Sequence, residues 1–304
     1  NAVKLQTYTP DTITLDCNKE DFLISGGTLW DGKTLYELYE EAYTPWEWHK
    51  HLFSVANEIG ITIFSSPFDK TSVDFLEELN TPAYKIASFE IKDIPLIEYA
   101  ASKKKPIILS SGIASLEDIE LAIETCKEAG NDQIILLKCT SSYPTPLELA
   151  NLNTIKDMKE RFGINIGFSD HTEGSLAPVI ARSLGACLIE KHVILDKSVG
   201  GPDADFSLTM NDFEEMVNQV RDTEKILGNI SYDLDKKIKA NLRFSRSLYA
   251  ACDIAKGEKI TELNVRSVRP GYGMHPKHLK DIIGKKANTD ITFGSRILKG
   301  NIKQ

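Results

Sequence analysis

A regular alternation of short apolar runs with longer amphipathic segments occupies residues 1–195 and leaves few folds open to this chain. These runs do not alternate apolar and polar residues, as a strand with one solvent-exposed face does. They therefore predict strands that are covered on both sides. We expect these strands at Ala2–Thr7, Ile61–Ser65, Ala83–Ser88, Pro106–Ser110, Ile134–Thr140, Asn165–Ser169 and Cys187–Val193. Buried parallel strands joined by helices indicate an α/β fold.

Helix signals fall between the apolar runs. Thr44, Pro45 and Glu47 predict a capping box with proline at the first helical position. A second helix is predicted to start after Ser115 and to stop at Gly130. Its apolar stripe consists of Ile119, Ala122, Ile123 and Cys126.

Seven strands with helical crossovers fit either a (β/α)8 TIM barrel or an open doubly wound sheet. No GxGxxG follows the first strand, which argues against the dinucleotide-binding version of the open sheet. A count of seven favours a barrel whose first strand is missing. Asn1 stands directly before a strand, so we also expect that an N-terminal stretch is not represented.

The composition changes towards the C-terminus. Short β-like runs at Ser247–Ala251 and Asn264–Val268 alternate with turn signals. We therefore predict a barrel domain over residues 1–230, a linker over 231–244 and a separate small β-rich domain over 245–304.

Composition excludes several classes of protein. Of 304 residues, 41% are hydrophobic and 26% are charged, as in ordinary soluble proteins, which excludes disordered and collagen-like chains. No apolar run approaches the ~18 residues of a membrane span, and no signal peptide opens the chain. The formal net charge is −8 and no basic patch stands out, which speaks against a nucleic-acid partner.

Five cysteines, an odd number without a CxxC pair, are scattered along the chain. Three of them lie inside strongly apolar segments, so we expect buried, reduced thiols rather than disulfides. Reduced thiols fit a cytoplasmic protein.

Polar side chains gather where the predicted strands end. The carboxyl ends of barrel strands are where barrel enzymes place their chemistry, so seven polar ends on one rim predict a pocket. These residues are Lys4, Gln6, Ser65, Ser66, Lys85, Ser88, Glu90, Ser110, Ser111, residues 139–143, residues 169–171 and residues 190–192.

Lys4 and Lys85 sit inside otherwise apolar strands, where a lysine is costly unless it has an anionic partner. Two lysines surrounded by hydroxyl groups suit a bound phosphate or carboxylate through charge-assisted hydrogen bonds. An ion pair with a barrel carboxylate such as Glu90 is the structural alternative.

His171 and His192 stand near the ends of consecutive strands, so their imidazoles can meet on the rim. Two neutral imidazoles can bind a divalent transition metal, and a pair of satisfied structural histidines is the alternative. Asp170 and Glu190 are candidates for orienting these rings or for ligating the metal. The loop at 200–203 is predicted to cover the pocket, unless it is an ordinary surface turn.

At these same residues the sequence resembles the sialic acid synthase family, which makes nine-carbon sugar acids from phosphoenolpyruvate. The matching segments are residues 3–11, 64–69, 83–90, 106–115, 137–146, 166–172, 188–196 and 201–208. Residues 245–271 resemble the antifreeze-like (SAF) domain that follows the TIM barrel in this family. The motif of the family's opening barrel strand is absent, in agreement with the missing strand inferred above.

Within the family, residues 26–49, 88–90, 139–145 and 267–279 resemble the pseudaminic acid branch. N-acetylneuraminate synthases usually carry glycine where Phe89 stands and asparagine where Ser141 stands. The resemblance implies condensation of phosphoenolpyruvate with 2,4-diacetamido-2,4,6-trideoxy-altrose and water. Synthesis of N-acetylneuraminate, legionaminic acid or a spore coat sugar is the alternative within the family.

The resemblance also implies roles for the polar residues of the rim. Phosphoenolpyruvate would be held by Lys4, Ser66, Lys85, Ser88, Ser141 and Ser169. The amino sugar would contact Gln6, Glu90, Tyr143 and Asp203. Chemical steps would fall to Lys85, Glu90, His171 and His192.

A catalytic divalent metal on His171 and His192 is implied as well, manganese first, with magnesium or cobalt as alternatives. Members of the family are domain-swapped homodimers, so Arg269, with Phe244 nearby, would reach the barrel mouth of the other subunit.

Two other functional classes stay open. One is an aldolase, with Lys85 forming a Schiff base, or a metal-dependent isomerase on the same barrel. The other is a sugar-binding module with an inert barrel.

Overall fold

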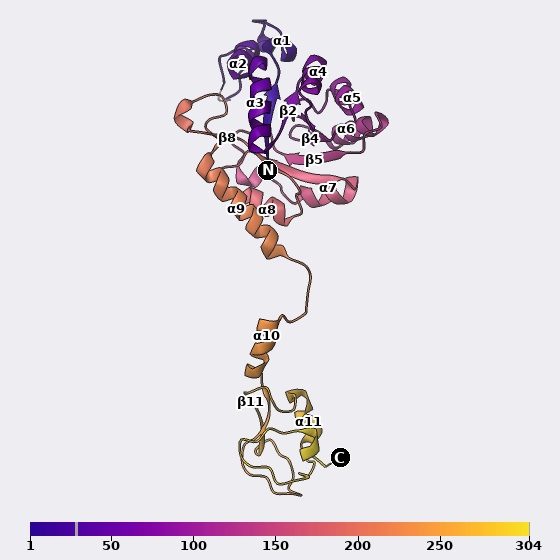
Figure 1. The fold of residues 1–304 in the computed structure, drawn as a ribbon, viewed down its shortest axis with the longest axis vertical. Coiled ribbons are helices and arrows are strands. Elements are labelled where there is room, and N and C mark those ends of the chain that lie inside the picture. Colours follow the sequence, from indigo (N-terminus) through magenta and orange to yellow (C-terminus); the bar gives the residue numbers. More distant parts are fainter. Residues whose placement is uncertain (28–29, 304) are drawn as a thin grey trace. The chain divides into compact units, whose positions relative to one another are not determined.

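The computed structural model describes residues 1–27 and 30–303, which form two compact units (Figure 1). The first unit comprises Asn1–Gly228, and the second begins at Asn229. Each unit has a hydrophobic core of its own.

The first unit is built on seven parallel strands that pair in the order β1 to β7. They are β1 (Ala2–Thr7), β2 (Thr62–Pro67), β3 (Tyr84–Ile86), β4 (Ile107–Ser110), β5 (Ile134–Cys139), β6 (Asn165–Asp170) and β7 (Ile189–Lys191). Side chains of β1 and β7 touch although these strands stand at opposite ends of that order, because Lys4 Nζ lies 3.1 Å from Glu190 Oε1. The sheet is therefore curled into a barrel, and the predicted fold is confirmed. A strand ahead of Asn1 stays a prediction.

Helices cover the outside of the curled sheet (Figure 1). They are α3 (Trp46–Ile59), α4 (Lys70–Glu78), α5 (Ile94–Ser102), α6 (Leu116–Glu128), α7 (Thr154–Phe162), α8 (Leu176–Ser183) and α9 (Met210–Leu227). Two short helices, α1 (Pro10–Ile13) and α2 (Leu35–Ala42), belong to the connection between β1 and α3. Single turns of 3-10 helix occur at Glu20–Phe22, Leu147–Leu149 and Lys197–Val199. A short parallel pair, β8 (Val193–Ile194) with β9 (Leu208–Thr209), follows β7.

Helix α6 begins and packs as predicted. Ser115 is its N-cap and forms a capping box with Asp118, and the four residues of the predicted apolar stripe are buried. Helix α3 corrects a second prediction, because Pro45 is its N-cap and no side chain caps it. The ψ angle of Pro45 is 130°, outside the helical range, so the helix starts at Trp46 and the capping box expected from Thr44 does not form.

The apolar core of the first unit lies mainly between the strands and the helices, where the cluster includes Leu76, Ile97, Leu109 and Ile155. A smaller cluster is formed by Phe64, Ile108 and Leu137, which belong to β2, β4 and β5. These residues alternate along their strands with neighbours in the larger cluster, so we place them inside the barrel.

The second unit pairs two antiparallel strands, β10 (Ser247–Ala250) and β11 (Val265–Val268). Its other elements are α10 (Lys236–Asn241), α11 (Leu279–Ile282) and 3-10 turns at Leu242–Phe244, Pro276–His278 and Lys299–Asn301. The segment predicted as a linker thus contains a short helix, which Asp235 caps. Residues such as Leu248, Ile260 and Ile297 are fully buried in the core of this unit.

All five cysteines are free thiols, as predicted. Burial is less extensive than expected, because Cys126 and Cys139 are buried while Cys187 and Cys252 are exposed. The cytoplasmic location derived from reduced thiols stays a prediction. Among the described residues, no helix is long and apolar enough to cross a membrane.

A buried histidine joins α3 to the barrel. His49 is fully buried, and its Nδ1 donates to the Pro45 carbonyl at 3.2 Å. Its Nε2 therefore accepts from the Thr7 hydroxyl at 2.9 Å, and Thr7 in turn accepts from Ser65 at 2.6 Å. Burial lowers the pKa of His49, against a smaller opposing effect of the Pro45 carbonyl.

A depressed pKa means that the folded state holds His49 neutral where the unfolded chain already binds a proton. We expect the free energy of unfolding to fall as the pH drops below about 6.5, by at most ~1.4 kcal/mol per pH unit for this one group. His49→Gln should flatten that slope, and His51→Gln, an exposed neighbour on the same helix, should leave it unchanged. Urea unfolding between pH 7.5 and 5 measures the difference, and equal slopes in all three proteins would contradict it.

Candidate active site

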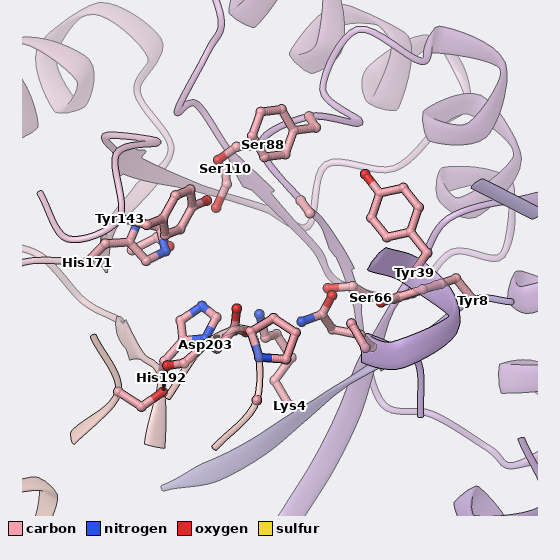
Figure 2. A pocket seen from close by; sticks show the side chains of 18 of the residues that line it. Lys4, Tyr8, Tyr39, Ser66, Ser88, Ser110, Tyr143, His171, His192 and Asp203 are labelled. Carbon is pink, nitrogen blue, oxygen red and sulfur yellow. Dashed lines mark hydrogen bonds and ion pairs between the residues drawn. The ribbon is translucent and has the colours of Figure 1, made fainter. Parts of the chain in front are cut away.

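A pocket with a volume of about 400 Å³ opens at the carboxyl ends of the barrel strands (Figure 2). Its size is in the usual range for small-molecule sites. Most of the residues predicted for the site line it, namely Lys4, Gln6, Ser66, Lys85, Ser88, Glu90, Tyr143, Ser169, His171, His192 and Asp203. The loop at 200–203 also lines the pocket, as predicted. Ser141 is not among the lining residues.

One carboxylate joins the two strand lysines. Glu190 Oε1 accepts from Lys4 Nζ at 3.1 Å, from Lys85 Nζ at 3.3 Å and from the Ser169 hydroxyl at 3.3 Å. Burial by itself would raise the pKa of Glu190, but the two ammonium groups outweigh it and hold that pKa well below its usual range. The lysines therefore form ion pairs with a carboxylate of the barrel, as the structural alternative predicted, but the carboxylate is that of Glu190 and not Glu90.

Two lysines on one carboxylate leave one positive charge unbalanced beside the pocket. Complete burial lowers the pKa of Lys85, against the attraction of Glu190. A buried ammonium of this kind gains from an added anion, because the anion replaces the water that burial has removed.

Serine hydroxyls without partners surround the lysines. The Oγ atoms of Ser66, Ser110 and Ser141 are buried, and none of them has a hydrogen-bond partner among the described residues. A Cβ placed on Gly112 would come within 2.1 Å of Ser141 Oγ and 2.5 Å of Ser88 Oγ, so this position requires glycine. Buried donors normally find partners, so hydroxyls that converge without them indicate a place for a ligand.

Two imidazoles face each other in the pocket, beside Lys4 (Figure 2). The ring centroids of His171 and His192 are 5.4 Å apart. His171 Nδ1 donates to the Thr140 carbonyl at 3.1 Å, and His192 Nδ1 lies 3.1 Å from the carboxylate of Asp203. Both Nδ1 atoms face acceptors and therefore carry the proton, which leaves each Nε2 with a free lone pair.

These two histidines fit a divalent metal. An imidazole nitrogen lies about 2.1 Å from a bound ion of this kind, so rings at this separation can share one. Metal-binding histidines usually donate the other ring N–H to a carboxylate or a carbonyl, as both do here. No group of three or more His, Cys, Asp and Glu side chains suited to a metal is found in the described ranges, so water or substrate would supply the remaining ligands.

Asp170 and Glu190 do not orient these rings, contrary to one of the predictions. Asp170 Oδ2 pairs with Lys191 Nζ at 2.6 Å, and both side chains are almost completely buried. Adjacent residues on a strand point to opposite faces, so Asp170 and Lys191 lie behind the strands that present His171 and His192 to the pocket. The carboxylate that holds a ring in place is Asp203, on the loop after β8.

Comparisons with known proteins agree with this geometry. Residues 1–232 match the NeuB family and residues 245–303 match the SAF domain. The chain belongs to the NeuB family. The resemblance found in the sequence is thereby confirmed.

Two relatives of the NeuB chain are pseudaminic acid synthases. The enzyme of Campylobacter jejuni (serotype O:2) is 50% identical over 303 residues, which cover 100% of this chain and 88% of that protein. The enzyme of Helicobacter pylori is 48% identical over 300 residues, which cover 98% of this chain and 86% of that protein. A crystal structure of N-acetylneuraminic acid synthetase from Leptospira borgpetersenii, in complex with citrate, has a TM-score of 0.69 and 31% identity, and covers 80% of this chain and 79% of that one.

Two buried side chains, Glu90 in the pocket and Cys139 beside it, have shifted pKa values. Burial raises the pKa of Glu90 to about 7, and its Oε2 has no hydrogen-bond partner among the described residues. Burial would also raise the pKa of Cys139, but contacts with His171, Ser88 and Lys85 outweigh it and lower that pKa to about 7. Glu90 is therefore partly protonated at neutral pH and can donate a hydrogen bond to a ligand.

One side of the pocket was not predicted as part of the site. The long connection between β1 and α3 contributes Tyr8, Ile13, Leu38 and Tyr39 to the lining. A sequence signal that could have identified them is the length of that connection, which exceeds the usual two to six residues of a βα loop.

Two predicted residues lie outside the barrel unit of this NeuB protein. Phe244 and Arg269 both belong to the second unit, so their role at a barrel mouth stays a prediction.

Proposed function

We propose that this chain is a pseudaminic acid synthase, which condenses phosphoenolpyruvate with 2,4-diacetamido-2,4,6-trideoxy-altrose and water to give pseudaminic acid and phosphate. The observation that carries the proposal is the anion site, where Lys4 and Lys85 share one carboxylate beside unpartnered serine hydroxyls. Near 50% identity over the whole chain to two pseudaminic acid synthases supports the sugar.

The chain's own residues account for phosphoenolpyruvate binding. Lys4 and Lys85 offer the charge that one carboxylate leaves unbalanced, and Ser66, Ser88 and Ser169 offer hydroxyls from three strands or strand ends around them. Ser141 would offer a further hydroxyl, whose place next to Gly112 is free because glycine has no side chain. Fixed donors of this kind cost no reorganisation as charge moves on the ligand, which is the usual source of electrostatic catalysis.

In the reaction, C3 of phosphoenolpyruvate bonds to the aldehyde carbon of the open-chain sugar, water adds at C2, and the bond from C2 to the phosphate oxygen breaks. Lys4 and Lys85 would hold the phosphate throughout. Partly protonated Glu90 would donate to a sugar oxygen, and Tyr143, whose pKa burial raises to about 12, would keep its proton for the same use. Gln6 and Asp203 would complete the contacts with the sugar.

We propose His171 and His192 as the protein ligands of a divalent metal, manganese first. When bound, such an ion supplies a Lewis acid for the aldehyde oxygen. Asp203 and the Thr140 carbonyl hold the two rings in the tautomer that such binding needs. This role also explains why two imidazoles face one pocket.

The other functions are less well supported. A neuraminate synthase is the alternative within the family, but the neuraminic acid synthetase of Leptospira borgpetersenii shares 31% identity against about 50% for the pseudaminic acid enzymes. A Schiff-base aldolase on Lys85 is less well supported because the relatives with about 50% identity are synthases. A barrel that only binds a sugar would not need the anion site at Lys4 and Lys85.

Phosphate release measures the activity directly. With manganese and phosphoenolpyruvate, we expect phosphate from the diacetamido altrose and at least tenfold less from N-acetylmannosamine. Lys85→Met should reduce kcat/KM by about a hundredfold or more, because removing a preorganised charge costs roughly that factor. Lys92→Met is a matched control, since this lysine pairs with Asp118 away from the pocket.

Preference for N-acetylmannosamine would move the protein to the neuraminate branch. If folded protein with added manganese releases no phosphate with any of the sugars, the synthase function is contradicted.

Metal dependence has its own test. Chelation should abolish turnover, and manganese should restore it. His192→Ala should weaken manganese binding at least tenfold, as measured by the electron paramagnetic resonance of free manganese, while phosphoenolpyruvate binding persists. His51→Ala serves as the control. Unchanged manganese affinity in the His192 variant would remove this residue from the metal site.

We propose that the working protein is a domain-swapped homodimer, in which Arg269 and Phe244 approach the barrel of the other subunit. Charge supports this proposal. The net charge of −8 combines 20 basic and 37 acidic residues in the first unit with 16 basic and seven acidic residues in the second. Opposite net charges on the two units favour their association.

Complementation tests the swap. His192→Ala and Arg269→Ala should each be nearly inactive alone. Co-expressed, they should form mixed dimers in which one barrel is intact and receives an intact Arg269, so about a quarter of the wild-type activity should return. No recovery in isolated mixed dimers would contradict the arrangement.

A further inference from the structure

An aromatic surface lies across the pocket from the two histidines (Figure 2). Tyr8 packs edge-on against Tyr39, with ring centroids 5.7 Å apart, and against Phe68 at 5.0 Å. Leu38, from the same helix as Tyr39, also lines the pocket and is almost fully buried. We call Tyr8, Leu38, Tyr39 and Phe68 the tyrosine wall.

The tyrosine wall combines apolar surface with two free hydroxyls. Neither the Tyr8 nor the Tyr39 hydroxyl has a hydrogen-bond partner among the described residues, although Tyr8 is 3% exposed. Burial raises the pKa of both phenols, so both keep their protons. Each can donate one hydrogen bond into the pocket, where Leu38 and Phe68 offer apolar contact.

The reacting end of the sugar must lie elsewhere. Its aldehyde has to meet the carbon that the lysines hold, next to His171 and His192. Asp203, which we assign to the sugar, pairs with His192 and lies on the side of the histidines that faces the tyrosine wall in Figure 2. A sugar that reacts beside the histidines therefore extends its distant carbons towards the wall.

The wall matches two substituents at that distant end. An acetamido group presents a carbonyl oxygen that accepts from a phenol and a methyl group that suits an apolar contact. A deoxy carbon presents a second methyl group. A sugar with free hydroxyls would instead lose hydrogen bonds to water and meet apolar carbon, which is costly.

We infer that the tyrosine wall binds the C4 acetamido group and the C6 methyl of the sugar, and that it selects a diacetamido trideoxy sugar over a hydroxylated one. This inference rests on the proposed function, because it assigns part of the same pocket. Tyr8 and Tyr39 recognise the acetamido carbonyl, and Leu38 contacts the methyl groups. The selectivity thus comes from the connection between β1 and α3.

Three sugars separate the contributions. The first is 2,4-diacetamido-2,4,6-trideoxy-altrose, the second has a C4 hydroxyl in place of the acetamido group, and the third has a C6 hydroxyl. Each is assayed by phosphate release with wild-type protein, Tyr8→Phe, Tyr39→Phe and Leu38→Asn. Tyr99→Phe, whose hydroxyl contacts Asp74 on the surface, and Leu121→Asn, on the exposed face of α6, are matched controls.

For the diacetamido sugar, we expect at least one phenylalanine variant to raise KM about threefold to tenfold, as the loss of one hydrogen bond predicts. The KM for the C4 hydroxyl sugar should change by less than twofold. Leu38→Asn should reduce the preference for the C6 deoxy sugar over its hydroxylated counterpart by about tenfold. In all variants kcat and the KM for phosphoenolpyruvate should stay near wild type.

A binding measurement needs no variant. The aromatic protons of the wild-type protein are saturated in a nuclear magnetic resonance experiment with the diacetamido sugar present. We expect saturation transfer to the C4 acetamido methyl and to the C6 methyl. Protein that contains ring-deuterated tyrosine and phenylalanine should lose this transfer.

The outcomes distinguish two failures. A wild-type protein that releases no phosphate with the diacetamido sugar would contradict the proposed function. A wild-type protein that is active with that sugar, but whose wall variants shift all three sugars equally, would overturn the tyrosine wall alone. Saturation confined to the C2 acetamido methyl would overturn it as well.

Discussion

The carboxylate of Glu190 is the interaction on which the rest of this barrel depends. It accepts from lysines on β1 and β3 and from a serine on β6, so it ties four strands together across the interior. A lysine as deeply buried as Lys85 would be strongly destabilising without it. Because one carboxylate serves two ammonium groups, the same contact that stabilises the curled sheet leaves a net positive charge beside the pocket.

That unbalanced charge explains how the pocket is divided. Lysines and unpartnered serines form a part suited to an anion, and the two imidazoles form a part suited to a cation. Asp203 lies near the second part and holds His192. Burial and His192 act on the pKa of Asp203 in opposite directions, and the histidine outweighs burial, so this carboxylate stays ionised. Opposite charges are thus kept apart within one cavity, so each part can bind a different partner.

The polar strand ends were predictable from the sequence because parallel strands place their carboxyl ends on one rim, whatever their length. Lys4, Lys85, His171 and His192 were identified in this way, and the structure brings all four to one pocket. Their partners were not predictable. Glu190 lies within β7 and Glu90 lies beyond the end of β3, and only the curl of the sheet brings Glu190 to both lysines. The capping box at Thr44 failed for a related reason, since one backbone angle at Pro45 moved the start of α3.

The sequence by itself determined the class of fold and the residue types on the rim, because strand burial and strand polarity are local patterns. It also carried the family, through motifs at the same strand ends. The tertiary structure alone decided which charges meet, that Asp203 rather than Asp170 orients an imidazole, and that Tyr8 and Tyr39 face the pocket. Those contacts join residues 11 to 186 positions apart, and their geometry depends on how strands and loops pack, which no local pattern records.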